Sequence, residues 1–378
     1  MNFHMPTRLI FGPGSIDALN KVVREELRAN QPVLITDRNL RQAGLVDRVT
    51  SLLDGLEVFD DVGANPKSTT VNRLGEMVRR KAPDVILGLG GGSAIDAAKA
   101  VALLATNQGR IEEYEGREKY VDAPLPVIAV PTTCGTGSEV TWVSVITDTR
   151  RNFKMSIKGP KLFPAVAVVD PDLLLTLPAG VVASTGMDAL THAIEAFTVK
   201  PGTVITDTFA LKAIRLVWDS LPRAYGNIAQ ENVARENLMY GSTLAGFAFG
   251  NSDVGAVHCI SESIGALFDV PHGVANAVFL PPVMRFNLPA CTERYARIAA
   301  AVGIAGKDER DSARLLVDEV EAMSRRIGIP RFMDLNIGPK EFPVIARYSC
   351  QNNSNASNPR DVTQQDYMAI LEDAQSRP

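Results

Sequence analysis

Val85-Ile-Leu-Gly-Leu-Gly-Gly-Gly-Ser-Ala-Ile-Asp-Ala-Ala-Lys-Ala100 runs from an apolar segment, through consecutive glycines, into an alanine-rich segment. The apolar run predicts a buried strand of a parallel sheet, and the alanines predict a helix directly after it. Glycines at such a junction let backbone N–H groups approach a phosphate, whose charge the helix N-terminus favours. The spacing departs from Gly-x-Gly-x-x-Gly, so a purely structural turn is the alternative for this loop taken alone.

A second loop of the same kind follows the next apolar run, Val127-Ile-Ala-Val130. It reads Pro131-Thr-Thr-Cys-Gly-Thr-Gly-Ser-Glu139 and places hydroxyl groups around two glycines. Hydroxyl and glycine N–H groups are suited to hold a pyrophosphate or a ribose. Because open α/β sheets bind ligands at the carboxyl ends of their strands, the two loops together favour a dinucleotide.

Asp37 lies at the end of another apolar run, Pro32-Val-Leu-Ile-Thr36. An acidic residue there can accept hydrogen bonds from an adenosine ribose and repel a 2′-phosphate, which favours NAD over NADP. The neighbouring Arg38 could instead receive that phosphate, so NADP stays open. The structural alternative for Asp37 is a helix N-cap.

The two halves of the chain differ in pattern. Up to Pro178, short β-branched runs alternate with helical stretches, which predicts a Rossmann-like α/β dinucleotide-binding domain with a mostly parallel sheet over residues 1–178. After Ala179 long helical segments take over, so we expect an all-α domain over residues 179–378, with a hinge near 177–180. The polar stretch 351–360 predicts a surface loop before a last helix that starts near Thr363. The predicted strands are 32–36, 58–62, 85–89, 127–130 and 166–170, and the predicted helices include 188–198, 206–221, 233–248 and 311–326.

Three of the four histidines, together with one aspartate, form a candidate metal site. Asp188 and His192 are four residues apart in a helical stretch, which places them on one face. His258 lies in a second helical run, and His272 follows in a segment rich in turn formers. Three imidazoles and one carboxylate suit Fe²⁺ or Zn²⁺ and are too rich in nitrogen for calcium or magnesium. Ordinary core or cap histidines are the alternative.

Composition excludes several classes of partner. Lys and Arg number 39 against 43 Asp and Glu. The sequence contains no basic block interleaved with aromatic residues, the pattern expected of a nucleic-acid-binding protein, so nucleic acid is not an expected partner. The N-terminus lacks a signal-peptide pattern and no apolar run is long enough to span a bilayer, so we expect a cytoplasmic protein without a membrane partner. The four cysteines are scattered, which indicates buried small side chains rather than disulfides.

Longer motifs resemble the iron-containing (group III) alcohol dehydrogenases of the dehydroquinate synthase-like superfamily. The similarity covers almost the whole chain. It includes Phe11-Gly-Pro-Gly14, the two glycine-rich loops with Asp96 and Lys99, Gly186-Met-Asp-Ala-Leu-Thr-His-Ala-Ile-Glu195, Ala245-Gly-Phe-Ala-Phe249, Pro271-His-Gly-Val-Ala-Asn276 and Asn358-Pro-Arg360.

The resemblance implies an active site in a cleft between the two domains. The metal ligands would be Asp188, His192, His258 and His272, and the metal Fe²⁺ or Zn²⁺. The dinucleotide, NAD or NADP, would contact Asp37, Asn65, Gly91, Gly92, Ser93, Asp96, Thr132, Thr133, Thr136, Ser138 and Lys154. Phe247, Phe249 and Val254 would either line an apolar pocket or pack in a helix core.

Glu262 is a departure from the family. Many members carry a histidine four residues after the third ligand, and here that position is Glu262. The catalytic residues would be His272 and Glu262, the latter relaying protons through a water chain. A fifth metal ligand, a contact for a cationic substrate group and a plain helix-surface residue are the alternatives for Glu262.

We therefore expect a metal-dependent, NAD(P)-linked alcohol dehydrogenase or aldehyde reductase, acting on a small alcohol or aldehyde as a homodimer or higher homo-oligomer. The alternatives are a zinc-dependent polyol dehydrogenase of glycerol type, a metal-free reductase of maleylacetate type, and a carbon–oxygen lyase similar to 3-dehydroquinate synthase. The intact set of four ligands argues against the metal-free reductase. The absence of Lys and Arg from 185–198 and 245–276 argues against the lyase, whose phosphorylated acid needs cations.

Overall fold

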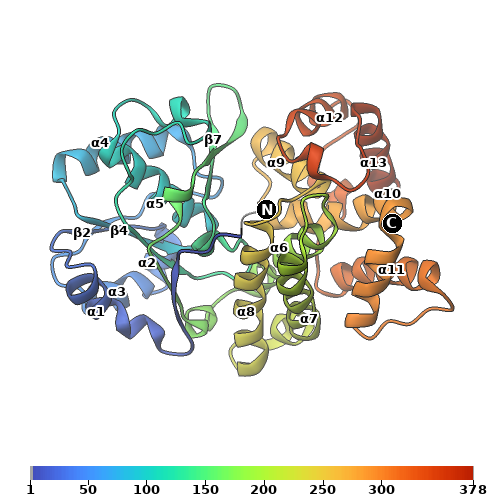
Figure 1. Ribbon diagram of the computed structural model, residues 1–378, viewed down its shortest axis with the longest axis horizontal. Helices are drawn as coiled ribbons and strands as arrows, with labels where there is room; N and C mark the ends of the chain where they lie inside the picture. The colour runs from blue at the N-terminus through green and yellow to red at the C-terminus, as the bar shows by residue number, and fades with distance from the viewer. Residues whose placement is uncertain (1–2, 378) are drawn as a thin grey trace. The chain divides into compact units, whose positions relative to one another are not determined.

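The structure, a computed structural model, describes residues 3–377 and contains two compact units (Figure 1). One unit is His4–Leu177, an α/β unit. The other begins at Pro178 and is helical. Phe3 belongs to the helical unit, where its ring stacks on Phe209 with centroids 5.7 Å apart.

The α/β unit is built on a six-stranded sheet in the order β1-β9-β6-β4-β2-β3. Every pairing in it is parallel, which confirms the predicted fold class. In register, Gly90 pairs with Pro131, so the two glycine-rich loops leave adjacent strands at the same edge. The strands are β1 (Arg8–Phe11), β2 (Pro32–Ile35), β3 (Glu57–Phe59), β4 (Val85–Gly90), β6 (Val127–Pro131) and β9 (Val166–Val169).

Helices cover both faces of this sheet, because alternate strand residues point to opposite sides. Ile86 packs in one core with Val71 and Val101 of the long helices, while Leu87 packs in the other core with Val46. Each such side chain, once fully buried, contributes about 1.5–3 kcal/mol. The helices of the unit are α1 (Leu19–Lys21), α2 (Arg38–Gln42), α3 (Leu45–Leu52), α4 (Ser68–Lys81) and α5 (Gly92–Thr106).

A second, three-stranded sheet was not predicted. It consists of β5 (Gly116–Arg117), β7 (Val143–Asp148) and β8 (Phe153–Lys158), with β7 and β8 antiparallel. Asn152 in the β7–β8 turn has φ 49°, a left-handed conformation that asparagine tolerates better than most residues. This hairpin carries Lys154, one of the predicted cofactor contacts.

The helical unit contains the predicted long helices with longer bounds. The largest helix, α10, was not predicted as a helix, since His272 was placed in a turn segment and is instead its first residue. The helices are α6 (Ala179–Thr198), α7 (Val204–Asn227), α8 (Asn232–Phe249), α9 (Ala256–Phe268), α10 (His272–Ala301), α11 (Glu309–Arg326), α12 (Phe342–Gln351) and α13 (Gln364–Ser376).

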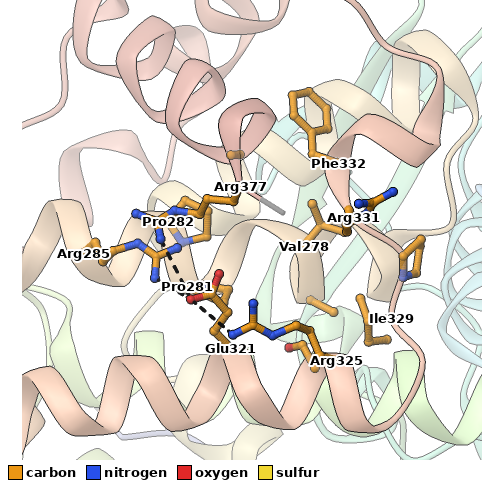
Figure 2. Close-up of a pocket in the computed structure, with 14 residues that line it drawn as sticks. Val278, Pro281, Pro282, Arg285, Glu321, Arg325, Ile329, Arg331, Phe332 and Arg377 are labelled. Atoms are coloured by element: carbon orange, nitrogen blue, oxygen red, sulfur yellow. Dashed lines mark hydrogen bonds and ion pairs between the residues drawn. The ribbon is translucent and has the colours of Figure 1, made fainter.

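Helix α10 also borders a small pocket of about 60 Å³ together with α11 and α13 (Figure 2). Pro281 and Pro282 lie inside α10 and cannot donate helix hydrogen bonds, which interrupts its regular hydrogen bonding there. A pocket of this volume is large enough to hold water. Figure 2 shows the carboxylate of Glu321 facing three guanidinium groups, those of Arg285, Arg325 and Arg377.

The polar stretch 351–360 was expected to be a plain surface connection, and this is wrong for its second half. Asn358 is buried, and its Oδ1 accepts hydrogen bonds from the backbone N–H of Ala256 and from the amide of Asn287. Helix N-termini leave unpaired N–H groups, so Asn358 satisfies one at the start of α9. The stretch therefore helps to fix the helix that carries His258.

Between residues 3 and 377, no helix combines the length and the apolar character needed to cross a membrane. The cysteines are all free, and three of them are buried.

Candidate metal centre and cofactor loops

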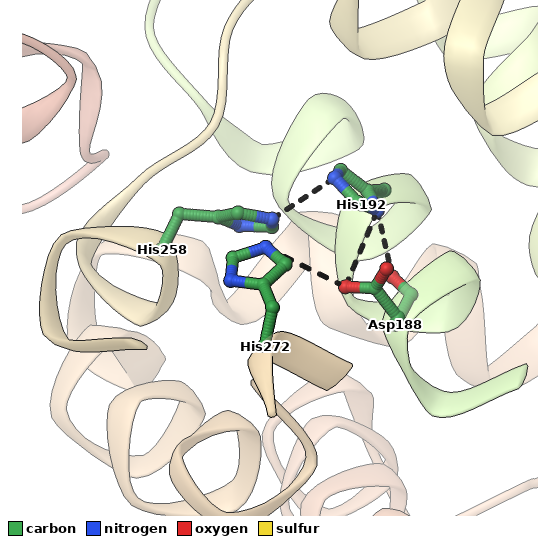
Figure 3. Close-up of side chains that lie close together, drawn as sticks. All are labelled: Asp188, His192, His258 and His272. Atoms are coloured by element: carbon green, nitrogen blue, oxygen red, sulfur yellow. Dashed lines mark hydrogen bonds and ion pairs between the residues drawn. The ribbon is translucent and has the colours of Figure 1, made fainter. Parts of the chain in front are cut away.

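Four side chains of the helical unit converge on one point (Figure 3). Asp188 and His192 come from successive turns of α6, His258 from the first turn of α9 and His272 from the start of α10. One ligand atom from each lies within 4.8 Å of those of the other three. The first three residues are buried and His272 is half-buried. The four residues grouped from the sequence are therefore the four that lie together in the structure.

The outer nitrogens of two histidines are already engaged. Nδ1 of His192 lies 2.9 Å from the backbone oxygen of Asp188, which can only accept, so Nδ1 carries the hydrogen. Nδ1 of His258 lies 2.5 Å from Oε2 of Glu195 and donates to that carboxylate. In its neutral form, each ring therefore presents a bare Nε2 to the centre.

These two Nε2 atoms lie only 3.0 Å apart. Two lone pairs at that separation repel unless a proton or a metal cation lies between them, and in a tetrahedral zinc site two ligand nitrogens are roughly 3.4 Å apart. Adding the Asp188 carboxylate and His272 gives three nitrogen ligands and one oxygen ligand. The donor set therefore fits a borderline divalent cation such as Fe²⁺ or Zn²⁺.

Burial favours neutral imidazole at His192. It lowers the pKa of His192 to about 4, although the Asp188 carboxylate acts in the opposite direction. Burial also acts to lower the pKa of His258, but the carboxylates of Glu195, Asp188 and Glu262 outweigh it and the pKa is raised. The region around His258 thus favours positive charge, as a cation-binding centre requires.

Asn276 contacts the same centre and was not singled out from the sequence as a site residue. It is fully buried on α10, one turn after His272. Its amide nitrogen lies 2.6 Å from Oδ1 of Asp188, 3.1 Å from Nε2 of His258 and 3.2 Å from Nε2 of His272. Asn276 follows His272 by four residues, just as His192 follows Asp188. This spacing was a sequence signal that could have identified Asn276 as a site residue.

Two further residues border the histidines. The ring of Phe249 stacks on His192, with centroids 4.3 Å apart, whereas Phe247 is buried against Phe209. Glu262 lies one turn after His258 on α9, and Oε2 of Glu262 accepts a 2.5 Å hydrogen bond from Asn352. Phe249 thus forms an apolar wall beside one ligand, and Glu262 is a polar group close to another.

The two glycine-rich loops of the α/β unit are in contact. Thr132 N–H donates to the carbonyl of Gly90, and a Cβ at Gly92 would lie 2.7 Å from the methyl group of Thr136. Glycine is therefore required there by close packing of the neighbouring loop. Gly91, Gly92 and Ser93 form the start of α5, whose first N–H groups lack helix partners and can bind a phosphate.

Asp37 lies two residues after β2 and is the N-cap of α2, which was the structural alternative for this residue. Its Oδ1 accepts from the N–H groups of Asn39 and Leu40. Its Oδ2 lies 3.7 Å from the position a Cβ would take on Gly90, next to the first glycine loop. The N-cap role leaves this second oxygen of Asp37 available, so Asp37 can cap α2 and contact a ribose at once.

Asn65, another predicted cofactor contact, is buried in the connection between β3 and α4, with φ 50°.

Asp96, Lys99 and Ser138 form a buried network behind the loops. Ser138 Oγ donates to Asp96 at 2.6 Å, and Lys99 Nζ donates to Ser138 Oγ at 2.9 Å. The other oxygen of Asp96 accepts from the N–H of Val145. Burial raises the pKa of Asp96 against the opposing effect of Lys99, and burial lowers the pKa of Lys99 to about 8. The network fixes the second loop from within the unit.

Matches to known proteins extend over almost the whole chain. Residues 6–171 match the model described as iron-containing alcohol dehydrogenase, and residues 182–375 match the C-terminal model of the Fe-containing alcohol dehydrogenase family. The chain is 36% identical over 380 residues to a NAD-dependent methanol dehydrogenase of Bacillus methanolicus, covering 99% of both. Among solved structures, a 1,3-propanediol oxidoreductase is 38% identical, with TM-score 0.94 and 99% of both chains covered.

A further solved structure is a sulfoacetaldehyde reductase of Bifidobacterium kashiwanohense in complex with NAD+. It is 31% identical, with TM-score 0.89, and the match covers 100% of this chain and 99% of that one. The full-length matches agree with the ligand cluster and the paired glycine loops. This chain belongs to the iron-containing alcohol dehydrogenase family.

Proposed function

We propose that the protein transfers hydride reversibly between NAD and a small alcohol or aldehyde, with Asp188, His192, His258 and His272 holding Fe²⁺ or Zn²⁺. The observation that carries the proposal is the pair of bare Nε2 atoms of His192 and His258, 3.0 Å apart beside a buried carboxylate. When bound, a divalent cation supplies Lewis acidity at this point. Hydride chemistry itself belongs to the nicotinamide.

NAD is the proposed cofactor because of the groups that surround the glycine loops. The residues predicted from the sequence to contact it all lie in the α/β unit, most of them in the loops that follow strands, with Asp96 on α5 and Lys154 on β8. Asp37 disfavours a 2′-phosphate, and the methanol dehydrogenase to which the chain is similar is NAD-dependent. Asp96 is proposed to hold Ser138 in place for NAD and not to contact NAD itself, because both of its carboxylate oxygens are hydrogen-bonded inside the unit.

The substrate is proposed to be small and without negative charge. Phe249 forms an apolar wall beside His192, and the segments 185–198 and 245–276 contain no Lys or Arg that could pair with an anionic substrate. This composition also disfavours a lyase acting on a phosphorylated acid. NAD(H)- and NADP(H)-coupled assays with short alcohols, diols and aldehydes test the proposal. Turnover with NAD and one of these classes supports it, and tight NAD binding without any hydride transfer contradicts it.

Glu262 is proposed to relay a proton to solvent through water. The Glu262→Gln variant is expected to lose about a hundredfold in kcat, the lower end of the range for a proton-transfer group. It should keep its metal, because no ligand is changed. Measurement of kcat at rising concentrations of a small buffer acid checks this, since free proton carriers should partly restore the variant.

Glu236→Gln is the matched control, because Glu236 lies on α8 and pairs with Tyr240. It should have the kcat of the parent enzyme. A Glu262→Gln enzyme with unchanged kcat would remove Glu262 from the mechanism, and loss of metal would assign it to coordination instead.

A further inference from the structure

Glu195 accepts hydrogen bonds from two consecutive residues at the start of α9. Its Oε1 accepts from the backbone N–H of Val257 at 2.9 Å, and its Oε2 accepts from Nδ1 of His258 at 2.5 Å. Glu195 is buried on α6, and only a few per cent of its surface is exposed. One carboxylate thus fixes both the position of the helix terminus and the rotation of the His258 ring.

The bond to Glu195 also determines which nitrogen of His258 is free. A carboxylate can only accept, so Nδ1 must carry the hydrogen and Nε2 stays bare toward the cluster. An amide in place of the carboxylate could present its own N–H groups to Nδ1. The ring would then carry its hydrogen on Nε2 and direct an N–H group at the cluster, where it cannot bind a cation.

Asn276 acts on a different ligand. Its amide donates to Oδ1 of Asp188 at 2.6 Å, and the amide nitrogen has only two hydrogens for the three acceptors around it. Its own Oδ1 is buried and has no hydrogen-bond partner among residues 3–377. Such a group costs about 1–3 kcal/mol. The contacts that this buried amide does make are those of its N–H groups, which face three ligands.

We infer that Glu195 and Asn276 are positioning residues of the metal centre, Glu195 for the tautomer of His258 and Asn276 for the carboxylate of Asp188. The inference rests on the proposed function, because it concerns the ion that this function requires. Mutation of a residue that is hydrogen-bonded to a metal ligand typically weakens metal affinity by about 10- to 100-fold. We assign an effect of that size to each residue.

The test is the affinity of the purified full-length protein for Co²⁺ and Zn²⁺, measured by competition with a chromophoric chelator. The Glu195→Gln and Asn276→Ala variants are each expected to bind both ions about 10- to 100-fold more weakly than the parent. The visible spectrum of bound Co²⁺ should change in both. Nitrogen NMR of the His258 ring, recorded at a pH where the ring is neutral, should show hydrogen on Nδ1 in the parent and on Nε2 in Glu195→Gln.

Asn72→Ala is the matched control for a buried asparagine. Asn72 lies on α4 in the α/β unit, where it bonds Glu112 and the N–H of Ile111, so its loss should lower stability without changing metal affinity. Glu195→Asp serves if the glutamine variant does not fold, since the shorter side chain keeps the charge and lengthens the contact to His258. It is also expected to weaken binding.

The outcomes separate the two proposals. A parent protein that binds neither ion removes the proposed function, and the inference with it. A parent that binds tightly, with Glu195 and Asn276 variants that bind within twofold of the Asn72→Ala control, overturns the inference alone. An unchanged His258 tautomer in Glu195→Gln overturns the part assigned to Glu195.

Discussion

Turnover of the Asp188→Asn variant is expected to fall by about three orders of magnitude, because the variant loses a charge-stabilising contribution of several kcal/mol. Asp188 supplies the one negative charge among the four ligands, against three imidazoles. The amide has nearly the same shape and retains an oxygen for the hydrogen bond from Asn276. The fold should therefore persist while the ion is lost. Metal content of the purified variant, with kcat/KM for the best alcohol, measures both effects.

Asp207→Asn is the control for a partly buried aspartate. Asp207 pairs with Arg294 through two contacts of 2.8 and 3.0 Å, and it lies near the start of α7. This variant should keep its metal and its turnover. An Asp188→Asn enzyme with parental turnover would show that the cluster is structural.

The Lys99→Met variant is expected to lose about 3–5 kcal/mol of unfolding free energy, the usual consequence of removing one partner of a buried charged pair. The ammonium group is fully buried and donates to the carbonyls of Thr141 and Val143, at 3.0 and 2.9 Å, as well as to Ser138. Methionine fills similar space but leaves these acceptors unsatisfied. Denaturant unfolding measures the change, and NAD affinity should fall because the second loop loses its support.

Lys161→Met is the control for Lys99, since Lys161 is exposed and such a change is usually worth less than about 0.5 kcal/mol. If Lys99→Met unfolded at the same denaturant concentration as this control, the buried network would not stabilise the unit. If its stability fell but NAD affinity did not, the network would support the fold without fixing the loop.

The sheet was predictable where apolar runs were continuous. Val85–Gly90 and Val166–Val169 are buried on both faces, so nearly every residue in them is apolar. The β7–β8 hairpin has mixed polar residues, and its turn at 149–152 lacks an Asn-Gly signal. Its strands form because neighbouring elements cover one face, which local sequence does not reveal.

Helix α10 shows the opposite problem. Pro281, Pro282 and Pro289 lie inside it, and proline in a helix interior ordinarily costs about 3 kcal/mol or more. Local preference therefore argued against a helix that tertiary packing nevertheless maintains. His272 was placed in a turn for a different reason, the turn formers of segment 268–273, although its side chain does lie in the cluster to which it was assigned.

The metal cluster was predictable from spacing only in part. The separation of Asp188 and His192 gives their shared face from helix geometry alone. Glu195 stands three residues after His192, so helix geometry also places it near that face, but its bond to His258 depends on how α6 and α9 pack. Partners that meet only through tertiary packing leave no trace in local sequence.

The most direct test of the central claim is NAD-linked alcohol turnover by protein that has been stripped with a chelator and then reconstituted with single ions. We predict that stripping abolishes turnover and that Fe²⁺ or Zn²⁺ restores it as a single ion binds per chain, whereas Mg²⁺ does not, because the three imidazoles disfavour it. Full turnover by the stripped protein would contradict the account. Equal restoration by Mg²⁺ would contradict the assigned ligand set.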